Sequence, residues 1–120
     1  MSDRIVVSGI HGFGYHGLFD QERKDGQDFF VDISLLVDLT AAIQSDAIEE
    51  TVNYAELTNL VIEEITTNPV NLIEKLAGRI AERILNQYLK VNSVDVTVHK
   101  PQAPVAAQIK DISVSVTRSR

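Results

Sequence analysis

The sequence contains no cysteine and no tryptophan, and it has only three prolines among its 120 residues. A chain without cysteine can form neither a disulfide nor a thiolate metal site, it has no cysteine nucleophile, and it suits the reducing cytosol. No uninterrupted apolar run exceeds three residues, which argues against a transmembrane helix and against the core of a signal peptide. We therefore expect a cytoplasmic protein with no membrane partner.

Positive charge is also scarce. The chain has 11 Lys+Arg against 17 Asp+Glu, a formal net charge of −6, and its basic residues form no cluster. This balance disfavours a nucleic-acid partner or an anionic membrane surface. A length of 120 residues with 44% hydrophobic residues is typical of one globular domain, which we expect to span residues 1–120.

Hydrophobic spacing predicts secondary structure in the order β-β-α-α-β-β. Alternation of apolar and polar residues indicates strands with one buried face, and apolar repeats at three and four residues indicate amphipathic helices. Strands are expected over residues 4–10, 29–39, 94–99 and 111–117, and helices over residues 57–65 and 73–88. A short helical piece is predicted near residues 41–44, and Asn71 is the predicted N-cap of the second helix.

This order favours an α+β fold. Antiparallel hairpins would form a four-stranded sheet, and the two helices would cover its single apolar face. The opposite face is then polar, with Asp32, Ser34, Asp38, Asp95, Thr97, His99, Ser113, Ser115 and Thr117. Such a sheet has two edges with unpaired backbone groups, which ring closure between subunits would satisfy. We therefore expect a homo-oligomer.

Two apparent motifs have simpler interpretations. Residues 12–17 match G-x-G-x-x-G, but a dinucleotide site needs a helix that opens on the third glycine, and here polar residues and a second strand follow. A glycine-rich bend or bulge is the better interpretation. The three histidines His11, His16 and His99 show none of the short spacings of zinc sites, so no metal site is predicted.

Four side chains have both a structural and a functional interpretation. Glu74 could complete a capping box with Asn71, and Glu22 could be a solvated member of the charged run at residues 20–25. Tyr54 could be a packing residue at the start of the first helix. Lys100 ends its strand on the face that the helices cover, so it must either extend to solvent or line a cleft.

Several short motifs occur together along the chain. They are residues 14–17 (GYHG) with Glu22, then 26–32 (GQDFFVD), 45–46 (SD), 51–54 (TVNY), 71–74 (NLIE) and 98–104 (VHKPQAP). In this combination and order they resemble the dihydroneopterin aldolase family of folate biosynthesis, and the resemblance covers essentially the whole chain. It implies the tunnelling fold, with subunits joined edge to edge into a ring-like barrel, two rings stacked into an octamer, and active sites between adjacent subunits.

The resemblance implies retro-aldol cleavage of 7,8-dihydroneopterin, a small-molecule pterin, to 6-hydroxymethyl-7,8-dihydropterin and glycolaldehyde, with epimerisation at C2′ as a side activity. The N5=C6 bond of the substrate is conjugated to C1′ and can accept the electrons that the broken C1′–C2′ bond releases. Neither a lysine imine nor a metal is then required, and general acid–base groups suffice. No cofactor is expected.

The resemblance also assigns roles. Lys100 is the principal acid–base residue. Tyr54, within hydrogen-bond reach of that lysine across the subunit interface, helps to transfer protons, including the one added at C1′. Glu74 accepts hydrogen bonds from the pterin 2-amino group and N3–H. Glu22 is a further catalytic residue that holds the trihydroxypropyl chain and can position a water. Backbone groups complete the substrate pocket near Val52, Leu72 and Ile73.

Three alternatives stay open. The first is an epimerase acting on dihydroneopterin or its triphosphate, although a triphosphate site should carry extra basic residues and this chain is acidic. The second is a zinc-dependent pterin synthase of the same fold. The third is a ring-forming scaffold without catalytic activity, in which Lys100→Ala would change nothing measurable.

Overall fold

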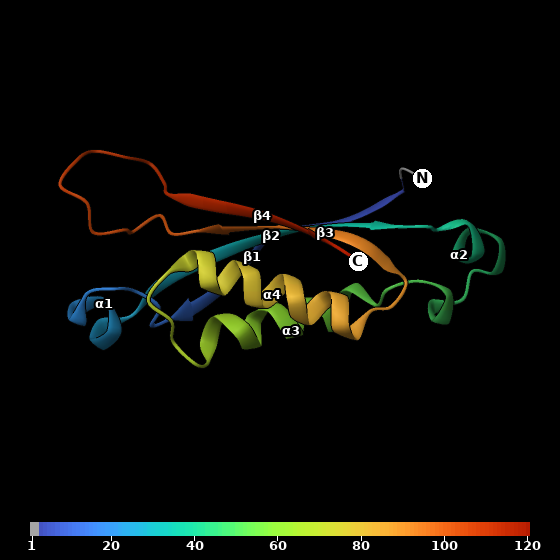
Figure 1. The fold of residues 1–120 in the computed structure, drawn as a ribbon, viewed down its shortest axis with the longest axis horizontal. Coiled ribbons are helices and arrows are strands. Elements are labelled where there is room, and N and C mark those ends of the chain that lie inside the picture. Colours follow the sequence, from blue (N-terminus) through green and yellow to red (C-terminus); the bar gives the residue numbers. More distant parts are fainter. Residues whose placement is uncertain (1–2) are drawn as a thin grey trace.

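The computed structural model describes residues 3–120 as one antiparallel sheet with helices on one face, as predicted (Figure 1). The strands lie in the order β1-β2-β3-β4 and are β1 (Arg4–Gly14), β2 (Gln27–Val37), β3 (Val91–His99) and β4 (Ser113–Ser119). The helices are α1 (Asp20–Asp25), α2 (Thr40–Ser45), α3 (Tyr54–Thr66) and α4 (Ile73–Gln87), with a 3-10 turn, η1 (Ile48–Glu50). Among residues 3–120, no helix combines the length and apolar character needed to cross a membrane.

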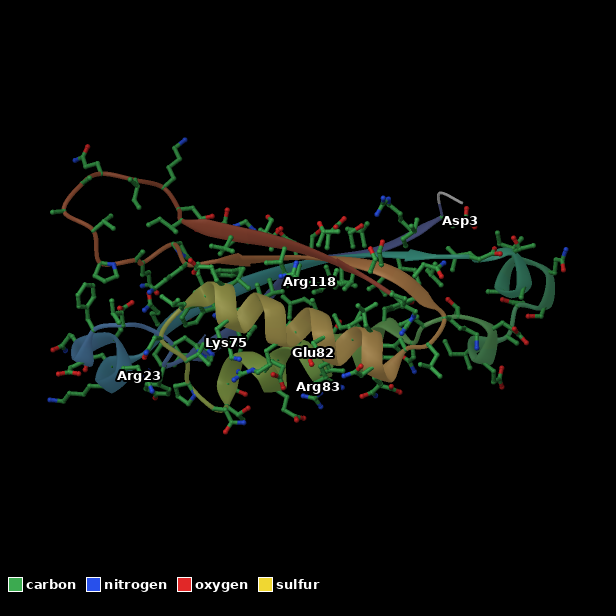
Figure 2. The ribbon with its side chains drawn as sticks, viewed as in Figure 1. Asp3, Arg23, Lys75, Glu82, Arg83 and Arg118 are labelled. Carbon is green, nitrogen blue, oxygen red and sulfur yellow. The ribbon has the colours of Figure 1, made fainter. Side chains whose placement is uncertain are left out.

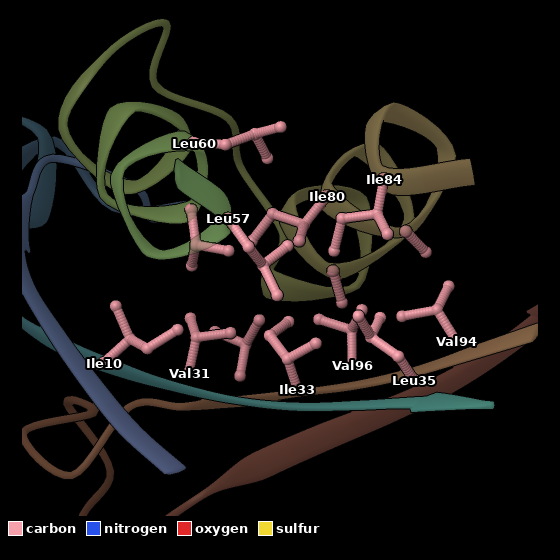
Figure 3. Close-up of a cluster of buried hydrophobic side chains, with 14 of the residues drawn as sticks. Ile10, Val31, Ile33, Leu35, Leu57, Leu60, Ile80, Ile84, Val94 and Val96 are labelled. Carbon is pink, nitrogen blue, oxygen red and sulfur yellow. The ribbon is translucent and has the colours of Figure 1, made fainter. Parts of the chain in front are cut away.

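The core lies between the sheet and the two long helices. Every second residue of β2 is buried, and its apolar members meet side chains of α3 and α4 that point toward the sheet (Figure 3). Leu57 and Ile80 are fully buried in this layer opposite Ile33 and Leu35. Burial of each such side chain contributes about 1.5–3 kcal/mol, so this interface fixes the helices on one face of the sheet.

Charged side chains cover the outward side of the helices, among them Lys75, Glu82 and Arg83 (Figure 2). The other face of the sheet is polar, as predicted. There Thr97 bonds Ser115 at 2.7 Å, and His99 lies between Asp32 and Asp111, with each nitrogen-to-oxygen distance 2.6 Å. Strands β1 and β4 form the two edges of this sheet, so each offers one row of backbone groups for pairing.

The first part of the glycine-rich segment, up to Gly14, is strand and not the bend or bulge that we predicted. Strand β1 continues to Gly14, four residues beyond the predicted end, and the register shift lies earlier, between Val7 and Ile10, where Gly9 has φ +69°. A Cβ at Gly12 would lie 2.7 Å from the side chain of Ile65, and one at Gly14 would lie 2.4 Å from its carbonyl oxygen. Glycine therefore lets β1 pass close under the end of α3.

The predicted cap of α4 is wrong. The helix begins at Ile73 with Leu72 in the N-cap position, so Glu74 is its second residue and forms no capping box with Asn71. The Asn71 side chain instead accepts a hydrogen bond from Arg23, 2.7 Å away. The asparagine that does cap a long helix is Asn53, whose side-chain oxygen accepts from the backbone N–H groups of Ala55 and Glu56 in the first turn of α3.

Candidate active site

Lys100 and Glu22 form an ion pair at one end of the molecule. Lys100 directly follows β3, and Glu22 is the inward-facing residue of α1, which is otherwise a charged surface helix. Their side chains are only 13% and 6% exposed, so the pair is far less screened by water than a surface salt bridge. The lysine therefore does not extend into solvent, and the glutamate is not simply solvated.

Further hydrogen bonds hold the Glu22 carboxylate. The side-chain amide of Gln27 donates to Oε2 at 3.0 Å, and the backbone N–H of Phe19 donates to Oε1 at 3.3 Å. Burial alone would raise the pKa of Glu22, but the bonds from Lys100, Gln27 and Phe19 outweigh it and lower that pKa. The cleft therefore contains a fixed carboxylate beside a fixed ammonium group.

Close approach of the chain to Glu22 requires glycine. A Cβ added at Gly17 would lie 2.5 Å from both Cβ and Cδ of Glu22. At the other end of α1, Gly26 has φ +70° and ends the helix, so the chain can turn directly into β2. These two glycines allow a helix of six residues to direct its one buried carboxylate at Lys100.

Five of the predicted site residues line one cleft of about 200 Å³: Glu22, Leu72, Ile73, Glu74 and Lys100. Glu74 lies in the first turn of α4, and the loop after Lys100 supplies a further wall through Ala103, Pro104 and Val105. A cleft of this size is smaller than the usual small-molecule site of about 300–1,000 Å³. The cleft formed by one chain is therefore small for a complete small-molecule site.

The other two predicted residues, Val52 and Tyr54, lie elsewhere. They line a groove of about 710 Å³ together with residues of β1, α2 and η1. The loop after Lys100 and α1 lie at one end of the 52 Å long molecule, whereas α2 lies at the other (Figure 1). Tyr54 is 65% exposed, so it is not the packing residue that its place at the helix start suggested. One chain does not bring Tyr54 to Lys100.

The three histidines have separate environments. His11 bonds Asp28 at 2.7 Å on the surface, His16 is fully buried, and His99 lies on the polar face of the sheet. Across residues 3–120, no group of three or more His, Asp or Glu side chains is arranged to hold a metal ion.

Sequence reasoning missed two residues beside the cleft, Gln27 and His16. Gln27 occupies the first buried position in the alternation of β2, where an apolar residue is expected, and its side chain supports Glu22. A polar residue at a core position of a strand is a signal that could have identified it. His16 lies in the glycine-rich motif, whose pattern gave no indication of burial.

The chain is similar to known proteins over almost its whole length. A sequence model described as FolB: Dihydroneopterin aldolase matches residues 5–117. The chain is 39% identical to the dihydroneopterin aldolase of Bacillus subtilis and 42% identical to that of Streptomyces coelicolor, in each case with 98% of both chains covered. A crystal structure of the dihydroneopterin aldolase of E. coli in complex with neopterin has the same fold, with a TM-score of 0.89 at 23% identity over 98% of this chain and 99% of that one.

Proposed function

Because the chain belongs to the dihydroneopterin aldolase family, we propose that it cleaves 7,8-dihydroneopterin into 6-hydroxymethyl-7,8-dihydropterin and glycolaldehyde. The observation that carries the proposal is the ion pair of Lys100 and Glu22, withdrawn from water in a cleft that Glu74 also lines. The three charged groups of this cleft can each contact one part of the substrate. The carboxylate of Glu74 would bind the pterin edge, that of Glu22 the hydroxylated tail, and the ammonium group of Lys100 would lie at the reacting centre.

In the proposed reaction the C2′ hydroxyl loses its proton and the C1′–C2′ bond breaks, which releases glycolaldehyde. The electron pair of that bond moves through C1′ and C6 to N5, where Lys100 stabilises the negative charge that develops and can supply a proton. A proton is then added at C1′, and any proton taken up at N5 returns to Lys100, which restores the N5=C6 bond and gives the hydroxymethyl product. If glycolaldehyde instead adds back on its other face before it leaves, the product is the C2′ epimer, so an epimerase side activity belongs to the same proposal.

We propose that the complete pocket lies between two copies of this chain. The small cleft at Lys100 would be closed by the groove of a neighbouring copy that carries Tyr54 and Val52, which brings the tyrosine hydroxyl to the lysine. Exposed apolar side chains at both ends support this pairing. They are Leu18, Phe19, Leu72 and Val105 around the cleft, and Val6, Ile43 and Ile48 around the groove. Edge pairing of β1 with β4 would close the copies into a ring, and two stacked rings would give a homo-octamer.

The decisive experiment is incubation of the purified protein with 7,8-dihydroneopterin, with and without a chelator. The amounts of glycolaldehyde, 6-hydroxymethyl-7,8-dihydropterin and the C2′ epimer are measured over time. We expect equimolar release of the first two products, at the same rate in both arms. An epimer formed without cleavage would support the epimerase alternative, loss of the reaction with chelator would support the zinc-dependent synthase, and unchanged substrate would support the scaffold.

A further inference from the structure

His16 is a fully buried histidine that the proposed chemistry does not use. Its Nε2 lies 2.7 Å from the carbonyl oxygen of Ile65, and its Nδ1 lies 3.1 Å from the backbone nitrogen of Val70. A carbonyl oxygen only accepts and a backbone N–H only donates, so Nε2 carries the proton and Nδ1 does not. Burial lowers the pKa of His16, which keeps the ring in this neutral form.

The contact with Val70 belongs to a set of bonds that hold one wall of the cleft. The residue after His16, Gly17, donates its backbone N–H to the carbonyl oxygen of Val70 at 2.9 Å. One residue further along this wall, Asn71 accepts the hydrogen bond from Arg23 at 2.7 Å. The wall then continues directly into Leu72, Ile73 and Glu74 of the cleft.

The same short segment also positions the opposite wall. Gly17 lies against Glu22 so closely that no Cβ fits between them, and Glu22 holds Lys100. The imidazole of His16 also packs edge-on against the ring of Phe29, with 5.3 Å between the two ring centroids. The pair of residues 16–17 therefore links the wall that carries Glu74 to the wall that carries Glu22 and Lys100.

We propose that His16 is a positioning residue for the substrate pocket. Through its Nδ1 it holds Val70, and with it residues 70–74, at a set distance from Glu22 and Lys100, which fixes the width of the cleft for the bicyclic ring. The bond from Nε2 to Ile65 secures the end of α3 and has no part in this role. The inference rests on the proposed function, because it assigns the cleft to a pterin.

Two variants separate the bonds of the ring. In His16→Asn the amide oxygen lies near the place of Nδ1 and can accept from Val70, but nothing reaches Ile65. In His16→Gln the amide nitrogen reaches the place of Nε2 and can donate to Ile65, but Val70 has no acceptor. Both variants lose the imidazole, so both should unfold at lower denaturant concentration than the parent. Their KM and kcat for cleavage and their Kd for neopterin, measured by fluorescence, are compared with the parent values.

We expect His16→Gln to show a KM and a neopterin Kd about 10-fold above those of His16→Asn, with kcat of the two variants within about twofold, since the change affects binding geometry rather than the reacting groups. Equal KM and Kd values in the two variants would overturn the proposal and leave His16 a structural residue. If the parent binds neopterin but releases no glycolaldehyde, the proposed activity fails, whereas the two Kd values still decide the role of His16.

A surface variant tests the same wall if neither histidine variant folds. Arg23 is exposed and donates hydrogen bonds to Asn71 at 2.7 Å and to the carbonyl oxygen of Gly17 at 3.4 Å, so Arg23→Ala removes a link between the two walls without disturbing the core. We expect KM to rise severalfold in Arg23→Ala, whereas the neighbouring exposed change Lys24→Ala leaves KM at the parent value. An unchanged KM in Arg23→Ala would show that the position of residues 70–74 does not set affinity, which overturns the proposal.

Discussion

The ammonium group of Lys100 and the carboxylate of Glu22 are paired in a nearly dry environment, although one residue follows a strand and the other lies in a short surface helix. Neither group has that partner in the unfolded chain. The tertiary fold therefore places a buried charged pair in a cleft whose other walls are mostly apolar, and the catalytic predictions below depend on it.

Replacement of Lys100 by alanine should remove the acid–base group but leave the assembly intact. We expect kcat to fall by about 100-fold or more, as is usual when a general acid–base residue is lost. The exposed Lys110, in the same loop, provides the control, because Lys110→Ala changes the net charge equally. Activity of the two variants is compared after size-exclusion chromatography. Turnover by Lys100→Ala at the rate of Lys110→Ala would favour a scaffold.

A shared pocket predicts complementation between two defective variants. Tyr54→Phe and Lys100→Ala should each have low activity alone, because every pocket has one defective wall. In a randomly mixed ring, about a quarter of the pockets combine Lys100 of a Tyr54→Phe chain with Tyr54 of a neighbouring Lys100→Ala chain. Co-expression should therefore raise the activity to roughly a quarter of the parent value. The measurement is kcat per chain of the mixed assembly. Activity no higher than that of the separate variants would show that Tyr54 and Lys100 of different chains do not share a pocket.

Replacement by alanine should lower the activity when it is made at Gly17 and raise the stability when it is made at Gly78. In Gly17→Ala the new methyl group displaces Glu22 from Lys100, and we expect kcat/KM to fall by about 10-fold to 100-fold, the scale of a misplaced active-site group. Gly78 lies within α4 with no atom near its potential Cβ, so Gly78→Ala should stabilise the protein by about 0.5–1 kcal/mol. Urea unfolding and steady-state kinetics test both. Full activity in Gly17→Ala would show that the ion pair of Glu22 and Lys100 is not needed for cleavage.

His99 should make stability depend on pH. Hydrogen bonds from the ring to Asp111 and Asp32 raise its pKa above the usual 6.5, with burial opposing them. Its contribution to stability is therefore complete below pH 6.5 and is lost as pH rises through the raised pKa. The free energy of unfolding in urea, measured from pH 6 to about pH 9, should fall less steeply with pH in His99→Gln than in the parent. The same slope in both proteins would contradict this assignment.

The alternation of β2 and the stripes of α3 and α4 made the fold predictable, since they are long and strongly periodic. Helix α1 was missed because it is short and has a single inward-facing residue, Glu22, whose direction depends on Lys100 far along the chain. The choice of Asn71 as a cap was wrong because α4 begins only at Ile73, and the Asn71 side chain accepts a hydrogen bond from Arg23, which is distant in sequence. A motif in one sequence also cannot show that Tyr54 and Lys100 line separate cavities of one chain.

The separation of these two residues within one chain has a kinetic consequence. If each working pocket needs two chains, a solitary chain in dilute solution has no activity at all, and the specific activity of a preparation falls when dilution separates the copies. A progress curve started from dilute protein would then begin with a lag while pairs re-form. The supply of reduced pterin in a cell would accordingly depend on how much of the protein is made, more steeply than in simple proportion.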